Sequence, residues 1–160
     1  MVNPINKSGQ DYEAILKPAF ERAGIHAIPQ QRLPVIGSLL PGKKYIMVDY
    51  YVTPGQLKDY SNIAISVKGL TTQGSEQDKL LSHVDRYIPS HPCPVILIML
   101  GDGWTPEYIQ FAKDNVDGRQ FLAVFTSSDE LFLWLKRAKD GDFPKIKVPT
   151  NNKQLTLFEL

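Results

Sequence analysis

A continuous run of apolar residues is the feature that most constrains the fold of this chain. The run covers residues 94–100, Pro-Val-Ile-Leu-Ile-Met-Leu, and Gly101 follows it. Its length fits a buried strand and falls far short of the roughly 20 apolar residues that cross a bilayer. A strand without polar alternation needs cover on both faces, which is typical of parallel sheets in α/β proteins. We therefore expect this segment to be the central strand of a sheet.

Segments before and after this strand alternate between two periodicities. In some, apolar residues recur every three or four positions, as on one face of a helix; in others, β-branched and aromatic residues alternate or cluster. The predicted order is α-β-β-β-α-β-α-β-α. We predict helices at residues 11–23, 75–87, 105–115 and 128–139, and strands at residues 33–36, 44–52, 62–68, 94–100 and 119–126.

Prolines refine the N-terminal part of this prediction. Pro18 lacks an amide hydrogen and should kink the first helix or split it near residue 16. Pro29 and Pro34 indicate that residues 25–40 are mainly loop, which leads into or contains the short strand at residues 33–36.

The order of the segments predicts an α/β fold with a mixed central sheet flanked by helices. Residues 44–52 and 62–68 should form an antiparallel pair, whereas the β-α-β stretches between residues 62 and 126 favour parallel crossovers. A chain of 160 residues, 42% of them hydrophobic, suits a single domain over residues 1–160 with its core at residues 8–139. Residues 140–160 should form a tail that adds an edge strand or docks on a neighbouring subunit.

Charge and cysteine content limit the classes of function. Eighteen Lys and Arg against 17 Asp and Glu give a net charge of +1, so any contact with nucleic acid has to be a local patch. The single cysteine, Cys93, excludes a disulfide framework and should fill core space. With no signal peptide and no membrane span, the cytoplasm is the expected location. His26, His83 and His91 lack ligand-like spacing, so no zinc site is expected.

Polar residues interrupt two predicted strands at positions that suggest chemistry. Asp49 lies in the middle of an apolar strand, where an ionised carboxylate is costly unless a cation or several donors meet it. Ser66 and Lys68 share one face of the next strand, and hairpin pairing brings Asp49 towards them. Glu13 lies on the helix that would cover this corner. A carboxylate for a divalent cation, a lysine for the attacking water and further oxygen ligands are what metal-assisted phosphodiester hydrolysis requires.

Each of these side chains also has a purely structural explanation. Asp49 could be satisfied by a turn or by Lys44, and Lys68 could be the solvated end of a strand. Glu13 could be an exposed helix residue, and Ser66 a small residue on a packed face. The functional interpretation rests on the combination of Asp49 with Lys68 on the following strand.

The same residues occur in the order found in a known superfamily. Gly9-Gln-Asp-Tyr-Glu13 is similar to the Gly-x-x-x-Glu opening of the first helix in archaeal Holliday-junction resolvases, and Val48-Asp49 stands where Pro-Asp would. Ser66-Val67-Lys68 takes the place of Glu-x-Lys. On these motifs, over residues 8–126, the chain resembles the PD-(D/E)XK nuclease superfamily, which includes restriction endonucleases.

This resemblance implies a restriction-endonuclease-like αβββαβ core and a site that uses Mg²⁺, with Mn²⁺ as a substitute. It implies that Asp49, Glu13 and the backbone carbonyl of Val67 hold the ion. Lys68 would position the attacking water, and Ser66 would hydrogen-bond to a metal-bound water. Because Ser66 replaces the usual acidic residue of the superfamily, the second carboxylate has to come from outside this strand.

Further candidate residues follow on the chain. Gly74-Ser75 and Lys79 resemble a pattern associated with bacterial restriction-type nucleases, and Ser75 should cap the helix over residues 75–87. In several superfamily branches this helix contributes to the site, which implies a catalytic role for Gln77 and makes Glu76 a second source of the missing carboxylate. The predicted DNA contacts are Gln73, Ser75 and Lys79, with Thr71 and Thr72 beside them.

These features predict a Mg²⁺-dependent, restriction-type DNA endonuclease. A double-strand break needs two cuts, so we expect a homodimer, and a cognate methyltransferase would be encoded nearby. Two alternatives stay open. A Holliday-junction resolvase or repair nuclease would use the same site, and the serine at position 66 also fits a catalytically inactive nuclease fold that serves as a DNA-binding or accessory subunit.

Overall fold

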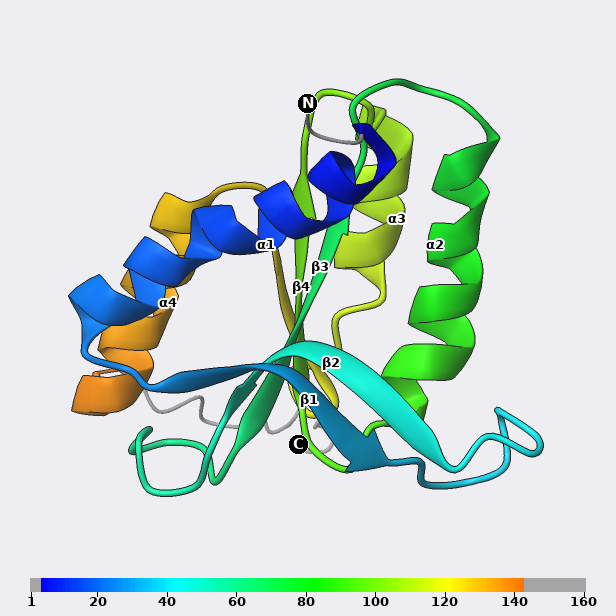
Figure 1. The fold of residues 1–160 in the computed structure, drawn as a ribbon. Helices are drawn as coiled ribbons and strands as arrows, with labels where there is room; N and C mark the ends of the chain where they lie inside the picture. The colour runs from blue at the N-terminus through cyan, green and yellow to red at the C-terminus, as the bar shows by residue number, and fades with distance from the viewer. Residues whose placement is uncertain (1–3, 143–160) are drawn as a thin grey trace, which may run out of the picture.

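The chain folds around a five-stranded mixed sheet with helices on both faces (Figure 1). The computed structural model describes residues 4–142. The strands lie in chain order across the sheet; β1, β2 and β3 are antiparallel neighbours, and β3, β4 and β5 run parallel. The predicted α/β class and order of elements are confirmed. The strands are β1 (Ala27–Pro34), β2 (Tyr45–Val52), β3 (Ile63–Gly69), β4 (Val95–Leu100) and β5 (Phe121–Phe125).

The helices form a layer on each side of the sheet. α1 (Pro4–Ala23) and α4 (Ser128–Asp140) pack together on one face, as Figure 1 shows on the left. The helical segment that connects β3 to β4 and α3 (Pro106–Asp114) cover the other face. Within residues 4–142, no helix has the length and apolar character needed to cross a membrane. The helical segment after β3 comprises a 3₁₀ turn (Ser75–Asp78), α2 (Lys79–Ser82), a π-helical turn (His83–Tyr87) and a second 3₁₀ turn (Ile88–Ser90).

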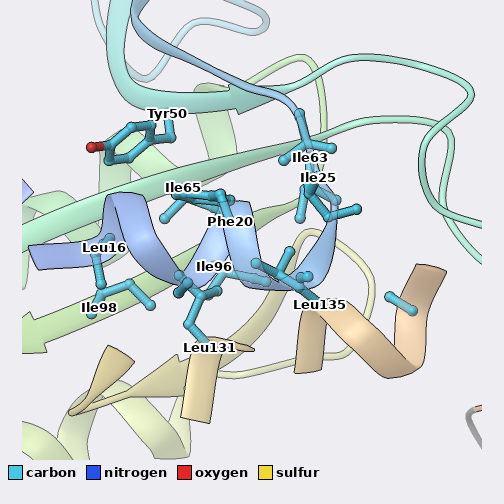
Figure 2. Packing of buried hydrophobic residues seen from close by; sticks show 14 of the residues in the cluster. Leu16, Phe20, Ile25, Tyr50, Ile63, Ile65, Ile96, Ile98, Leu131 and Leu135 are labelled. Carbon is cyan, nitrogen blue, oxygen red and sulfur yellow. The ribbon is translucent and has the colours of Figure 1, made fainter. Parts of the chain in front are cut away.

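The core confirms that the apolar run is the centre of the fold. All six residues of β4 are buried, and alternate side chains point into the two layers. Figure 2 shows Ile96 and Ile98 of this strand with Leu16 of α1 and Leu131 of α4. Each fully buried aliphatic side chain of this kind contributes about 1.5–3 kcal/mol of hydrophobic free energy. This packing fixes α1 against the sheet and so determines where Glu13 lies.

The first strand is longer than predicted and contains both of its prolines. β1 runs from Ala27 to Pro34, whereas the sequence predicts a loop with a short strand at residues 33–36. Pro29 and Pro34 are tolerated because β1 lies at the edge of the sheet, where only one side of the strand has to supply ladder hydrogen bonds.

Three local predictions also need correction. α1 begins at Pro4, so Gly9 lies inside the helix rather than before it, and the helix is not split at Pro18. The ring of Pro18 is exposed, and buried residues before and after it hold both halves of the helix against the core.

Gly74, not Ser75, is the N-cap of the helical segment after β3, which has no side-chain cap. The predicted tail lies outside the described residues from residue 143 onward.

Strands β2 and β3 pair over only part of their length. Residues 50–52 of β2 pair with residues 63–65 of β3. Before Tyr50, β2 continues beside β1, and after Ile65, β3 continues beside β4. The two strands therefore separate at Asp49, and Figure 1 shows the β1–β2 hairpin turning away from the direction of β3. We refer to this separation, beside Asp49 and Val67, as the β2–β3 gap.

A glycine allows α1 to approach the end of β3 closely. A Cβ atom on Gly69 would lie 1.9 Å from Cδ2 of Tyr12, well inside van der Waals contact. The aromatic ring of Tyr12 therefore occupies space that any other residue at position 69 would need. Because Glu13 follows Tyr12 on α1, this contact brings the helical carboxylate to the β2–β3 gap.

Candidate functional site

Asp49 lies where β2 and β3 separate, and its carboxylate joins the two strands. Oδ2 of Asp49 accepts a hydrogen bond of 2.6 Å from the backbone N–H of Val67. The carboxylate thus replaces the carbonyl group that a continuing ladder would supply. In an antiparallel ladder the N–H and C=O of one residue face the same neighbour, so we expect the carbonyl of Val67 to face the gap as well. This agrees with the predicted proximity of Asp49 to the Ser66-Val67-Lys68 strand.

Glu13 reaches the same gap from α1. Its backbone carbonyl accepts a hydrogen bond of 2.8 Å from the hydroxyl of Tyr50, and its Oε1 accepts one of 2.5 Å from Nε2 of Gln30. Its carboxyl group also lies close enough to that of Asp49 to be affected by its charge. Partial burial, followed by the negative charge of Asp49, raises the pKa of Glu13 to about 7. Glu13 therefore still holds a proton in part of the molecules near neutral pH.

Lys68 lies close to the two carboxyl groups at the end of β3. Its positive charge acts to lower the pKa of Glu13, which places the ammonium group within electrostatic reach. The backbone carbonyl of Lys68 accepts a hydrogen bond of 3.2 Å from Nε1 of Trp104. Lys68 is half-buried, and the strand and the indole hold its backbone in place. The predicted trio of Asp49, Glu13 and Lys68 is therefore brought together by β2, α1 and β3.

Ser66 is paired with a histidine. Its Oγ lies 2.9 Å from Nε2 of His83, and the two groups are hydrogen-bonded. Burial, followed by the nearby positive charge of Lys68, lowers the pKa of His83 well below its ordinary range. The imidazole is therefore neutral at pH 7. The Ser66–His83 pair therefore provides polar groups without a negative charge.

A cavity of about 500 Å³ lies between β2 and the helical segment after β3. Asp49, Ser66 and Lys68 form part of its wall. Three lysines face one carboxylate in this lining, so the cavity is suited to an anionic ligand. The other lining residues are Lys43, Ile46, Met47, Val48, Lys79, Ser82, His83, Tyr87 and His91.

The remaining predicted residues divide into two groups. Lys79 lines the cavity, and it also forms an exposed ion pair of 2.9 Å with Glu76. Gln73 and Ser75 are exposed in the segment after β3, beside Thr71 and Thr72, and do not line the cavity. Glu76 lines a smaller cavity that also touches Lys68.

Gln77 is not brought to the trio. It is buried, and its Oε1 accepts a hydrogen bond of 2.8 Å from the backbone N–H of Thr105. Thr105 is the N-cap of α3, so Gln77 satisfies a backbone group at the start of that helix. The structure gives this side chain a structural position rather than the predicted catalytic one.

Three residues that the sequence did not indicate also belong to this region. His83 lacks any ligand-like spacing, yet the helical segment aims it at Ser66. Lys43 is on the loop between β1 and β2 and lines the cavity, with its Nζ 5.8 Å from the ring centre of Tyr87. Gln30 follows Pro29, in a segment that the sequence predicted to be mainly loop. No signal in a single sequence connects these residues with Asp49, because each depends on tertiary packing.

The oxygen donors at the gap fit a magnesium-like ion better than a zinc-like one. Mg²⁺ is commonly held by one or two carboxylates with water completing its shell, whereas structural zinc takes Cys and His. Glu13 and Asp49 provide two carboxylates, and the carbonyl of Val67, which we expect to face the gap, would be a third oxygen. Among the side chains of residues 12–142, no cluster of three or more His, Cys, Asp or Glu is arranged for a metal ion.

The carboxyl pair predicts that Glu13→Gln stabilises the protein at alkaline pH. The pKa of Glu13 rises from 4.5 to about 7 on folding, so its contribution is fully present below pH 4.5 and is lost as pH rises through 7. A neutral Gln avoids this loss. After discounting for solvent exposure, we expect a gain of about 1–2 kcal/mol at pH 8 and almost none at pH 4.5. Urea unfolding of both proteins at these two pH values measures it, and an equal effect at both would contradict the prediction.

A function for this chain has to be argued from the residues around the β2–β3 gap. Neither a scan against protein-family models nor a search of curated proteins found a match to the chain.

Proposed function

We propose that this protein is a metal-dependent DNA endonuclease of the restriction type. The observation that carries the proposal is the meeting of Asp49, Glu13 and Lys68 from three different elements at the point where β2 and β3 separate. Two carboxylates with a lysine beside a basic cavity form the donor set needed to hold a divalent cation and a phosphodiester together. We also propose that the mixed sheet and its helices form a restriction-endonuclease-like core.

The residues of the gap have separate roles in the proposed reaction. Asp49, Glu13 and the carbonyl of Val67 would hold Mg²⁺ or Mn²⁺, which supplies Lewis-acid activation when bound. Lys68, next to the carboxyl pair, would orient the attacking water and offset negative charge that develops on the phosphate. Ser66, fixed by His83, would hydrogen-bond to water in this region. The carboxylate that the strand lacks at position 66 would come from Glu13.

Contacts with DNA would come from the basic cavity and from the exposed segment after β3. Lys43 and Lys79 flank the cavity that contains Asp49, and lysines contact phosphates irrespective of sequence. Gln73 and Ser75 are exposed nearby along the chain and carry hydrogen-bonding groups for base or backbone contacts. Cutting both strands would require a homodimer with one site for each strand, and protection of host DNA would require a cognate methyltransferase.

A second candidate function is a nuclease-like fold without activity that binds DNA or assists another protein. The observation that favours it is the Ser66–His83 pair, which is neutral where an acidic residue would hold the cation. In this case the basic cavity would still bind DNA, but neither metal-dependent cleavage nor tight Mn²⁺ binding would occur.

Cleavage assays with supercoiled plasmid and phage DNA test the proposal. Wild-type protein should give discrete fragments with Mg²⁺ or Mn²⁺ and none with EDTA. Lys68→Ala should lower the cleavage rate by roughly 100- to 1,000-fold, since it removes one positive group from the reacting centre. Lys113→Ala, an exposed lysine on α3 outside the cavity, is the matched control and should cut like wild type.

The other outcomes identify the alternatives. Nicking of plasmid or cutting of four-way junctions without discrete fragments would favour a repair nuclease or a Holliday-junction resolvase. Folded wild-type protein that binds DNA but neither cuts it nor binds Mn²⁺ in calorimetry would favour the inactive subunit. Equal cleavage by wild type and Lys68→Ala would contradict the proposed site.

The raised pKa of Glu13 predicts that metal binding depends on pH. A cation at the carboxyl pair has to displace the proton that the raised pKa of Glu13 retains near pH 7. Mn²⁺ affinity should therefore fall about tenfold for each pH unit below 7 and level off above pH 8, with close to one proton released per ion at pH 6. Calorimetry in two buffers of different ionisation enthalpy counts this proton. Glu13→Gln should bind Mn²⁺ weakly and release none.

A further inference from the structure

Gln30 lies opposite Asp49 in the β1–β2 ladder. Its neighbours Pro29 and Gln31 pair with Tyr50 and Val48, so the register places Gln30 across from Asp49. That position is absent from a ladder that otherwise runs from Ala27 to Pro34. The pairing of the edge strand is therefore interrupted next to the carboxylate at the β2–β3 gap.

The backbone of Gln30 accounts for this interruption. Its φ angle is +53°, and it is the one non-glycine residue with positive φ in the described part of the chain. This left-handed conformation is unfavourable for residues with a Cβ atom, although Asn and Gly adopt it more readily. Such conformations persist where the surrounding structure determines them, and they are frequent at functional sites.

The side chain of Gln30 connects the edge strand to the helical carboxylate. Its Nε2 donates a hydrogen bond of 2.5 Å to Oε1 of Glu13, 17 positions away on α1. Tyr50, on β2, holds the backbone carbonyl of the same glutamate. One contact thus fixes the helix turn that carries Glu13, and the other fixes the orientation of its carboxyl group.

We propose that Gln30 is a positioning residue that holds the carboxyl group of Glu13 towards Asp49 for metal binding, an inference that rests on the proposed nuclease function. The strained backbone directs the amide group to α1, and the hydrogen bond removes rotational freedom from the Glu13 side chain. Partners that orient a metal-binding carboxylate typically change metal affinity or activity by about 10- to 100-fold when removed.

Gln30→Asn tests this role by separating stability from function. Asn tolerates positive φ better than Gln, so the melting temperature should stay the same or rise. Its side chain is one methylene shorter and should lose the hydrogen bond to Glu13. We expect Mn²⁺ affinity to fall about 10- to 100-fold, with a comparable loss of kcat and an unchanged KM for DNA. Gln30→Gly should behave in the same way.

Gln31→Asn is the matched control. Gln31 is the next residue of β1, and its Nε2 contacts the backbone carbonyl of Arg32 rather than Glu13. This variant should bind Mn²⁺ and cut DNA like wild type. The role of Gln30 is overturned if Gln30→Asn binds Mn²⁺ as tightly as wild type, or if its activity follows its melting temperature. A folded wild type that neither binds Mn²⁺ nor cuts DNA would overturn the proposed function itself, and Gln30 with it.

Discussion

Asp49→Asn should strongly reduce metal-dependent cleavage while the protein stays at least as stable as wild type. The Asn side chain keeps an oxygen that accepts the hydrogen bond from the N–H of Val67, so the link between β2 and β3 survives. The negative charge that would hold the cation is lost. We expect the rate of DNA cleavage to fall roughly 100- to 1,000-fold. Plasmid cleavage and Mn²⁺ calorimetry measure the loss, and urea unfolding measures the stability.

Asp49→Ala separates the two functions of this carboxylate. It removes the charge and also leaves the N–H of Val67 without its acceptor at the gap. An unsatisfied backbone donor costs about 1–3 kcal/mol, so this variant should be less stable than Asp49→Asn by that amount and equally inactive. Equal stability of the two variants, or cleavage by Asp49→Asn at the wild-type rate, would contradict the role given to Asp49.

Gly69→Ala should both destabilise the fold and weaken metal binding. The new Cβ atom would lie 1.9 Å from the ring of Tyr12, so α1 or the ring has to move. Overpacking of this kind costs about 1–3 kcal/mol. Because Glu13 follows Tyr12, a shift of α1 separates the two carboxyl groups, and Mn²⁺ affinity should fall as well. Thermal unfolding and calorimetry measure the two effects.

A double-mutant cycle with Tyr12→Ala provides the control. The three atoms nearest to the added Cβ all belong to the ring of Tyr12, so once the ring is removed, adding Gly69→Ala should cost little further stability. The two substitutions should therefore couple by most of the cost of the single Gly69→Ala change. If their effects on unfolding free energy simply add, contact with Tyr12 is not the reason for a glycine at position 69.

The central part of the fold could be predicted because its sequence signals are local. The apolar run of β4 and the helical spacing of α3 and α4 depend on few distant contacts. The edge strand β1 was mostly missed, because its prolines are compatible with a strand only where one side lacks a partner. That condition belongs to the whole sheet, and no window of sequence contains it.

The site residues likewise divide into those with a local sequence signal and those whose role depends on distant contacts. Asp49 and Lys68 could be paired in advance because they lie on consecutive strands, and Glu13 was indicated by the resemblance of its motif. Gln77 is of a residue type that occurs in such sites, but its side-chain oxygen accepts a hydrogen bond from the backbone at the start of α3. The sequence around Gln30 does not indicate a site residue, because its role depends on a left-handed backbone conformation and on a contact with Glu13, 17 positions away in the chain.

The short ladder between β2 and β3 has a mechanical consequence. Three residue pairs join the β1–β2 hairpin to β3, and the far end of the hairpin is tied to the backbone of Ser90 through the N–H of Ile36. Between these two attachments, residues 46–49 of β2 form part of the cavity wall, and Asp49 is one of them. A ligand that fills the cavity therefore contacts β2 directly. Any movement of β2 on binding would change the distance from Asp49 to Lys68.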